Sequence, residues 1–147
     1  MNLRRIPSLP GRLVAATAIL AALHVALCVL YAFPSLSQRQ YAIPGRISVV
    51  SYVEGHGYYW SVGFGAVAVA LVLAAVSGRM VSVAHVLGGA VMMAYTMALA
   101  WGALASHPHG PLVSAALAAM YAFLHLIIAN TYVAVEHYRQ TTYARPE

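Results

Sequence analysis

Charge is scarce in this chain of 147 residues, and most of it has one sign. Asp and Lys are absent, so the 8 basic residues are all Arg, against 3 Glu. Only 7% of the residues are charged, whereas soluble domains carry about 25%. The lone cysteine, Cys28, excludes a disulfide framework. A chain with so few charges cannot cover a water-facing surface, so we expect a protein whose solvent is lipid.

Sequence motifs for catalysis, nucleotide binding and nucleic-acid binding are missing as well. No nucleotide-binding loop is present, and no Ser, His and carboxylate assemble into a nucleophilic site, so we expect no enzymatic activity. No basic stripe alternates with stacking aromatics, which argues against a nucleic-acid partner. The function must therefore be read from the polar residues inside the apolar runs.

Four long apolar runs dominate the sequence. A helix needs about 20 apolar residues to cross a hydrocarbon core of about 30 Å. The runs that meet this length are Leu13–Phe33, Gly57–Ser77, Met80–Ser106 and Pro111–His137. The sequence therefore predicts an all-α integral membrane four-helix bundle that forms a single domain.

The gaps between the runs are short apart from one loop, Pro34–His56. Within this outer loop, Arg46–Val53 alternates weakly between apolar and polar residues. The alternation predicts either a short strand or an interfacial segment. Ser77, Gly78 and Arg79 make a tight turn between the second and third runs, where Gly78 can supply the left-handed residue that ends a helix.

The arginines predict how the chain is inserted. Those expected on one side are Arg4, Arg5, Arg12, Arg79, Arg139 and Arg145, and those on the other are Arg39 and Arg46. The positive-inside rule then places both termini on the cytoplasmic side of the membrane. The membrane that we expect is the cell's inner (plasma) membrane. The first run is longer than the apolar region of a signal peptide and lacks a small-residue cleavage site, so we expect it to remain as a helix.

Small residues recur at every fourth position of the third run. The row consists of Ala90, Ala94, Ala98 and Gly102. Positions four apart share one side of a helix, and small side chains let membrane helices approach closely. We therefore expect this row to be a helix-packing face. Similar rows on the other runs indicate self-association.

Three histidines lie well inside the runs. His24 and His125 are near the middle of their runs, whereas His85 follows Arg79 by six residues and is expected nearer the cytoplasmic side. On the fourth run, His125 shares a polar stripe with Tyr121, Tyr132 and Glu136, and we expect this stripe to face the interior of the bundle. Asn130 points to the opposite side of the same helix.

These histidines allow three interpretations. They can be neutral imidazoles that form hydrogen bonds across the bundle. His24 and His125, at similar depth on different helices, can instead supply two axial ligands to haem b. A proton path along His24, His125, Tyr132 and Glu136 is the third interpretation.

A metal site in the outer loops has less support. His107 and His109 form a His-x-His pair, and His56 is expected on the same side of the membrane. Two or three histidines can hold Zn²⁺ or Cu²⁺. The set lacks a Cys, and Glu54 is the nearest carboxylate. We therefore expect ordinary solvated turns and no metal.

The overall pattern resembles a family of small four-span membrane proteins encoded by phages of actinobacteria. An Arg-only inner charge pattern, the aromatic segment 57–60 (GYYW), and the segment 109–112 (HGPL) that opens a last span with Tyr121 and His125 carry the resemblance. It implies a holin-like role, in which subunits associate in the inner membrane and form a lesion. The Arg-only, Ala-rich composition also suggests a GC-rich actinobacterial coding sequence.

Two functions thus remain open from the sequence. One is a self-associating, holin-like or other phage-type membrane effector without a cofactor. The alternative is an accessory or haem b-bearing subunit of a membrane redox complex. Either way, the partners we expect are the lipid bilayer and further protein subunits.

Overall fold

The computed structural model describes residues 11–33, 48–106 and 112–143 of the chain. They form five helices: α1 (Gly11–Ala32), α3 (Val49–Gly55), α4 (Tyr59–Ser77), α5 (Val81–Ala105) and α6 (Val113–Tyr143). All but α3 are long and apolar enough to cross a membrane. The predicted all-α class and the four spans are confirmed, and the protein is a small multi-span membrane protein.

The observed helices differ from the predicted runs at two places. α6 continues to Tyr143 instead of ending at His137. The segment expected as a strand or interfacial piece contains α3, which begins at Val49. The side chain of Ser48 caps this helix by accepting a hydrogen bond from the Ser51 N–H at 3.1 Å, which stabilises a helical start over a strand.

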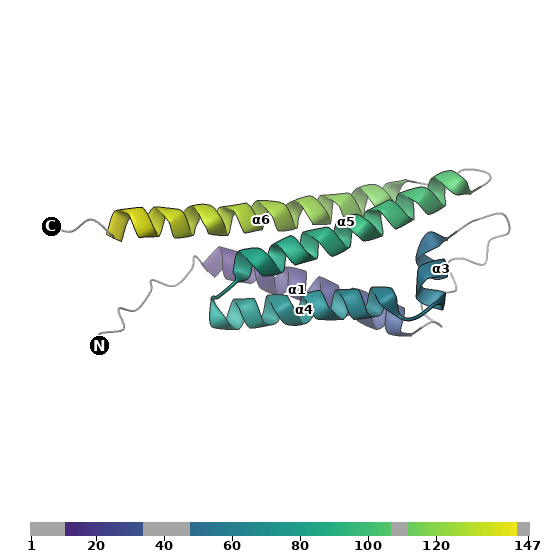
Figure 1. Ribbon diagram of the computed structural model, residues 1–147, viewed down its shortest axis with the longest axis horizontal. Helices are drawn as coiled ribbons and strands as arrows, with labels where there is room; N and C mark the ends of the chain where they lie inside the picture. Colours follow the sequence, from purple (N-terminus) through teal and green to yellow (C-terminus); the bar gives the residue numbers. More distant parts are fainter. Residues whose placement is uncertain (1–10, 34–47, 107–111, 144–147) are drawn as a thin grey trace.

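The long helices form two antiparallel pairs (Figure 1). α1 packs along α4, and α5 packs along α6, while the pairs come close mainly where α4 meets α5. The start of α1, the α4–α5 turn and the end of α6 share one end of the bundle, and α3 lies at the other. This arrangement agrees with four spans; the cytoplasmic location of the termini stays a prediction.

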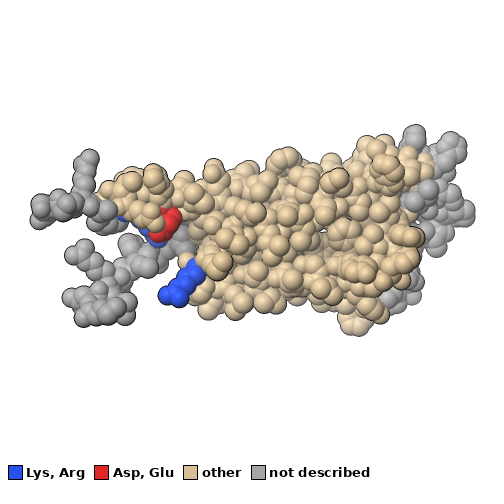
Figure 2. All heavy atoms as spheres, in the orientation of Figure 1, with Lys and Arg blue, Asp and Glu red and all other residues tan. Residues whose placement is uncertain are grey.

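The outer surface of the bundle is apolar. Figure 2 shows a face on which charged atoms appear only near one end, next to the α4–α5 turn and the end of α6. Large apolar side chains are exposed along this length, such as Val69 (59%), Val76 (84%) and Ile127 (62%). Apolar groups exposed at this density would be costly in water. They are the expected contact with lipid tails.

The α4–α5 turn has the predicted geometry. Gly78 adopts a left-handed conformation with φ of +65°, and its N–H donates to the carbonyl of Ala74 at 2.8 Å. Glycine has no Cβ, so this conformation carries no steric cost. The turn holds α4 and α5 antiparallel.

At the opposite end, Glu54 fixes α3 to the start of α4. Its carboxylate accepts hydrogen bonds from the Trp60 N–H at 2.8 Å and from the Ser61 hydroxyl at 3.0 Å. An acidic group at a helix N-terminus satisfies free N–H groups and complements the helix dipole. The Trp60 indole also donates to the carbonyl of Val50 at 3.2 Å. Glu54 is therefore engaged in capping a helix.

The close approach of α5 to α6 is made by glycines outside the predicted row. A Cβ added to Gly88 would lie 2.5 Å from the His125 ring, and one added to Gly89 would lie 3.4 Å from the Ala122 carbonyl oxygen. Of the predicted packing row, Gly102 is buried and Ala98 is half-buried, whereas Ala90 and Ala94 are exposed. The row therefore does not form one contact within this chain, because the face of α5 that carries His85 turns inward instead.

Two apolar clusters fill the interior of the bundle. The cluster near the α4–α5 turn contains Leu20, Ala21, Val67, Leu71, Ala74, Val81, Ala84, Ile128 and Tyr132. The cluster near α3 contains Tyr31, Val50, Phe64, Met92, Ala118 and Ala122. On α1, α5 and α6, the three intramembrane histidines fall between the members of these clusters. A polar layer thus separates two apolar layers.

The contact at Gly88 generates a prediction. In the Gly88→Ala variant, the new methyl group meets the buried His125 ring, and overpacking of this kind costs about 1–3 kcal/mol. Thermal unfolding in detergent should show a lower melting temperature. Gly63→Ala is the control, since its Cβ would lie at an ordinary 3.7 Å from Val91. Equal melting temperatures for the two variants would contradict the proposed close approach.

Candidate functional site

A chain of polar side chains crosses the middle of the bundle. The Tyr132 hydroxyl lies 3.5 Å from the Thr17 hydroxyl, which lies 3.0 Å from Nε2 of His85. Nδ1 of His85 is 3.1 Å from Nδ1 of His125. The ring of His125 in turn contacts the ring of His24, with centroids 5.0 Å apart. Thr17 and the three histidines have no exposed surface.

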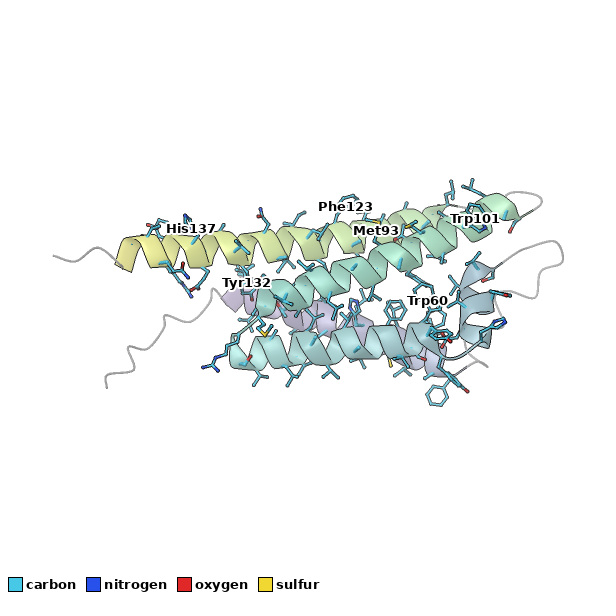
Figure 3. All side chains as sticks on the ribbon, viewed as in Figure 1. Trp60, Met93, Trp101, Phe123, Tyr132 and His137 are labelled. Carbon is cyan, nitrogen blue, oxygen red and sulfur yellow. The ribbon has the colours of Figure 1, made fainter. Side chains whose placement is uncertain are left out.

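Helix periodicity brings these side chains together. Thr17 and His24 are seven residues apart on α1, and so are His125 and Tyr132 on α6. Seven residues are nearly two full turns, so each pair lies on one side of its helix. Figure 3 shows Tyr132 on the side of α6 that faces α1 and α4, and Phe123 on the opposite, outer side. Gly88 leaves the space that the His125 ring occupies.

The hydrogen bonds assign a proton to each ring. Nδ1 of His24 lies 2.9 Å from the Leu20 carbonyl oxygen, which only accepts, so Nδ1 of His24 carries the proton. The Thr17 hydroxyl donates to the Leu13 carbonyl at 2.9 Å. Its oxygen is then free to accept from Nε2–H of His85. One proton is therefore assigned to Nδ1 of His24 and one to Nε2 of His85, with the positions inferred from their partners.

The same reasoning settles His125. Because His85 is protonated at Nε2, its Nδ1 is an acceptor, and the partner Nδ1 of His125 must be the donor. In the opposite assignment, His125 would bury an N–H without an acceptor, which is rarer in proteins than a buried lone pair. The Tyr132 hydroxyl can donate to the second lone pair of Thr17. Every N–H and O–H group in this row of side chains then has an acceptor.

Two acceptor nitrogens are left over. Nε2 of His24 and Nε2 of His125 are buried and have no hydrogen-bond partner within the described parts of the chain. Their surroundings include the ring of Phe64, whose centroid is 5.8 Å from that of His24. A buried acceptor without a donor raises the free energy of the folded state. The layer can therefore accept a hydrogen bond or a proton at these two nitrogens.

The row of hydrogen-bonded side chains ends, at Tyr132, beside a cleft near the α4–α5 turn. The cleft has a volume of about 710 Å³ and is lined by Tyr132 together with Arg79, Glu136, His137 and Arg139. Tyr132 thus joins the buried polar layer to a charged end of the bundle. At the other end, the rings of Phe64 and Tyr95 pack edge to face with centroids 5.3 Å apart.

The haem interpretation does not fit this geometry. Two axial histidines must present one nitrogen each to an iron from opposite faces of a flat macrocycle. The rings of His24 and His125 instead touch edge to face, with planes at 81°. His125 also lies within hydrogen-bonding distance of His85. The pair as folded leaves no room for a porphyrin, so geometry gives the haem b alternative no support.

No family model, curated protein or solved structure matches this chain.

The predicted polar stripe is only partly an interior feature. His125 and Tyr132 are buried, whereas Tyr121 (39%) and Glu136 are exposed. Tyr121 and Glu136 lie toward the two ends of the predicted stripe. From His125 and Tyr132, the buried polar contacts lead to side chains of α1 and α5 and do not follow α6.

The weak metal candidates do not assemble in the described part of the chain. His56 is exposed, and its Nδ1 donates to the Tyr52 carbonyl at 2.7 Å. His107 and His109 lie outside the described residues. Among residues 11–33, 48–106 and 112–143, no group of three or more His, Cys, Asp or Glu is placed to hold a metal ion.

Sequence reasoning missed Thr17 and misjudged the depth of His85. Thr17 was not singled out, although its distance of seven residues from His24 places both on one side of α1. His85 was expected nearer the cytoplasmic side, but the structure places it against His125. The pattern His85-x-x-Gly88-Gly89 is the signal that could have placed His85 at this helix contact, because it puts a polar group and two small residues near one another on α5.

The role of Thr17 generates a prediction. Thr17→Val keeps the shape but removes the acceptor for Nε2–H of His85, and hydrogen bonds between membrane helices are worth about 0.6–2 kcal/mol. We expect a lower melting temperature in detergent. Thr96→Val is the matched control, because the Thr96 hydroxyl donates to Met92 of its own helix at 2.8 Å. A loss of stability that is equal for the two variants would refute the contribution of the chain.

Proposed function

We propose that the protein is a holin-like membrane effector, whose copies associate in the inner membrane and open a water-filled lesion. One observation carries the proposal: Thr17 and the three intramembrane histidines gather at the joint between two helix pairs. Thr17 and His24 belong to the α1–α4 pair, and His85 and His125 belong to the α5–α6 pair.

The joint has a different character from the rest of the bundle. Within each pair, the helices pack along their length, whereas the backbones of the two pairs come close mainly where α4 meets α5. Tight packing of small residues, such as Gly88 and Gly89, lies inside a pair. The pairs can therefore separate without loss of the contacts that hold each pair together.

Lipid and water have opposite effects on such a separation. Polar groups that lose their partners in a hydrocarbon environment cost several kcal/mol each, about 2–7 by transfer measurements. The same imidazoles and hydroxyls are well solvated by water. Opening at the joint is therefore favoured where water enters, and the exposed inner faces supply the polar wall that a lesion needs. The outer faces stay apolar and in contact with lipid.

The test is entry of a membrane-impermeant dye into bacterial cells that express the chain. The wild-type protein should admit the dye. His125→Leu replaces a polar wall residue by an apolar one that water does not solvate in the open lesion. We expect dye entry to slow by about fivefold, the factor for about 1 kcal/mol of lost solvation.

His56→Leu is the matched control, because His56 is exposed outside the spans and its ring bonds only within its own helix turn. Expression of each variant is compared through an epitope tag. Absence of dye entry with the wild-type protein at full expression would overturn the lesion-forming function. Equal entry with wild type and His125→Leu would overturn the part that the joint plays in it.

A further inference from the structure

The outer face of the α5–α6 pair carries a groove. Its volume is about 410 Å³, and it is lined by Ser82, Val83, Val86, Leu126, Ala129, Asn130 and Val133. No charged side chain is among these residues. The groove lies within two helices that are long and apolar enough to span a membrane.

Asn130 is the unusual member of this lining. It is exposed, and its side-chain amide forms no hydrogen bond with the residues that the structure describes. The neighbouring Thr131 differs, since its hydroxyl donates to the Ile127 carbonyl of its own helix at 2.8 Å. Asn130 thus faces out of the bundle with two N–H donors and a carbonyl acceptor unused.

The position of Asn130 makes this exposure expensive. It precedes Glu136 by six residues, which is about 9 Å along a helix. If the charged end of α6 lies at the membrane surface, the amide lies inside the hydrocarbon layer. An amide without partners there costs several kcal/mol, about 2–7 by transfer measurements. A hydrogen-bonding partner for Asn130 within the membrane would therefore be strongly favoured.

The chemistry of the groove selects an identical partner. An amide both donates and accepts, so two copies related by a two-fold axis can form reciprocal hydrogen bonds between their Asn130 side chains. Copies inserted in the same orientation carry Asn130 at the same depth. A partner that presents a charged side chain would find no counter-charge in the groove.

We propose that this groove is the contact between two copies of the chain, with the Asn130 amides of the two copies hydrogen-bonded to each other. The contact deepens the proposed function by naming the association surface. Asn130 points away from the side of α6 that carries His125 and Tyr132, so dimerisation and the internal joint use different faces of the α5–α6 pair.

Oxidative cross-linking of the full chain in membranes tests the contact. In a Cys28→Ala background, Val133→Cys places a thiol in the groove one turn beyond Asn130, where the two copies should form a disulfide. Val69→Cys on α4 is the matched control, because both valines are exposed, at 55% and 59%. We expect a dimer with Val133→Cys and none with Val69→Cys.

Adding Asn130→Leu to the Val133→Cys chain should weaken dimerisation about tenfold, which corresponds to about 1.4 kcal/mol. Asn130→Gln, which retains an amide, should restore part of it. An unchanged dimer yield with Asn130→Leu would overturn the proposal. Cross-linking through Val69→Cys alone would overturn it as well. A chain that stays monomeric, with Asn130 hydrogen-bonded to lipid, would also overturn it.

Dye entry separates this inference from the proposed function. Loss of the dimer together with loss of dye entry in Asn130→Leu supports the contact and its use in the lesion. Loss of the dimer with full dye entry supports the contact and overturns its part in lesion formation. A dimer that persists overturns the contact whether or not the dye enters.

Discussion

The hydrogen-bonded chain from Thr17 through His85 to His125 is the interaction on which the arrangement of the bundle depends. It links α1 to α5 and α6, whose backbones do not run close to α1. Between apolar helices in lipid, the hydrophobic effect supplies little attraction, so packing and hydrogen bonds decide which helices stay together. Glycines bring α5 and α6 together, and imidazoles and hydroxyls hold the two pairs.

Lipid as a solvent explains why these hydrogen bonds stabilise the bundle, and it supports the proposal that the bundle opens. A buried imidazole without a partner is costly in hydrocarbon, and His24 and His125 each keep one such nitrogen. The hydrogen bonds from Thr17 to His125 are thus all made, whereas Nε2 of His24 and Nε2 of His125 have no donor among the described residues. The same side chains would be stabilised by water. In the proposed function, the bundle is closed while its interior is dry and exposes polar side chains once water enters.

Much of the fold follows from the sequence because the bilayer restricts what a backbone can do. Each spanning segment must satisfy its own hydrogen bonds, so an apolar run of sufficient length predicts a helix. Details that depend on which helices meet were less accessible. The stride of four that marks Ala90 and Ala94 is real, but the inward face of α5 is set by His85 and the glycines after Gly88. His24 and His125 were expected at one depth and are in contact. Sequence reasoning misses Thr17 and misjudges the depth of His85, because the partners of both residues lie on other helices.

The protonation state of the three rings tests the account most directly. Nitrogen NMR of the histidine-labelled protein in lipid bilayers distinguishes the two neutral tautomers and the charged ring, and single His→Gln variants assign the signals. At neutral pH the account predicts neutral rings, with His85 protonated at Nε2 and both His24 and His125 protonated at Nδ1. A charged ring in this layer, or His85 protonated at Nδ1, would contradict the chain of hydrogen bonds that joins the two helix pairs.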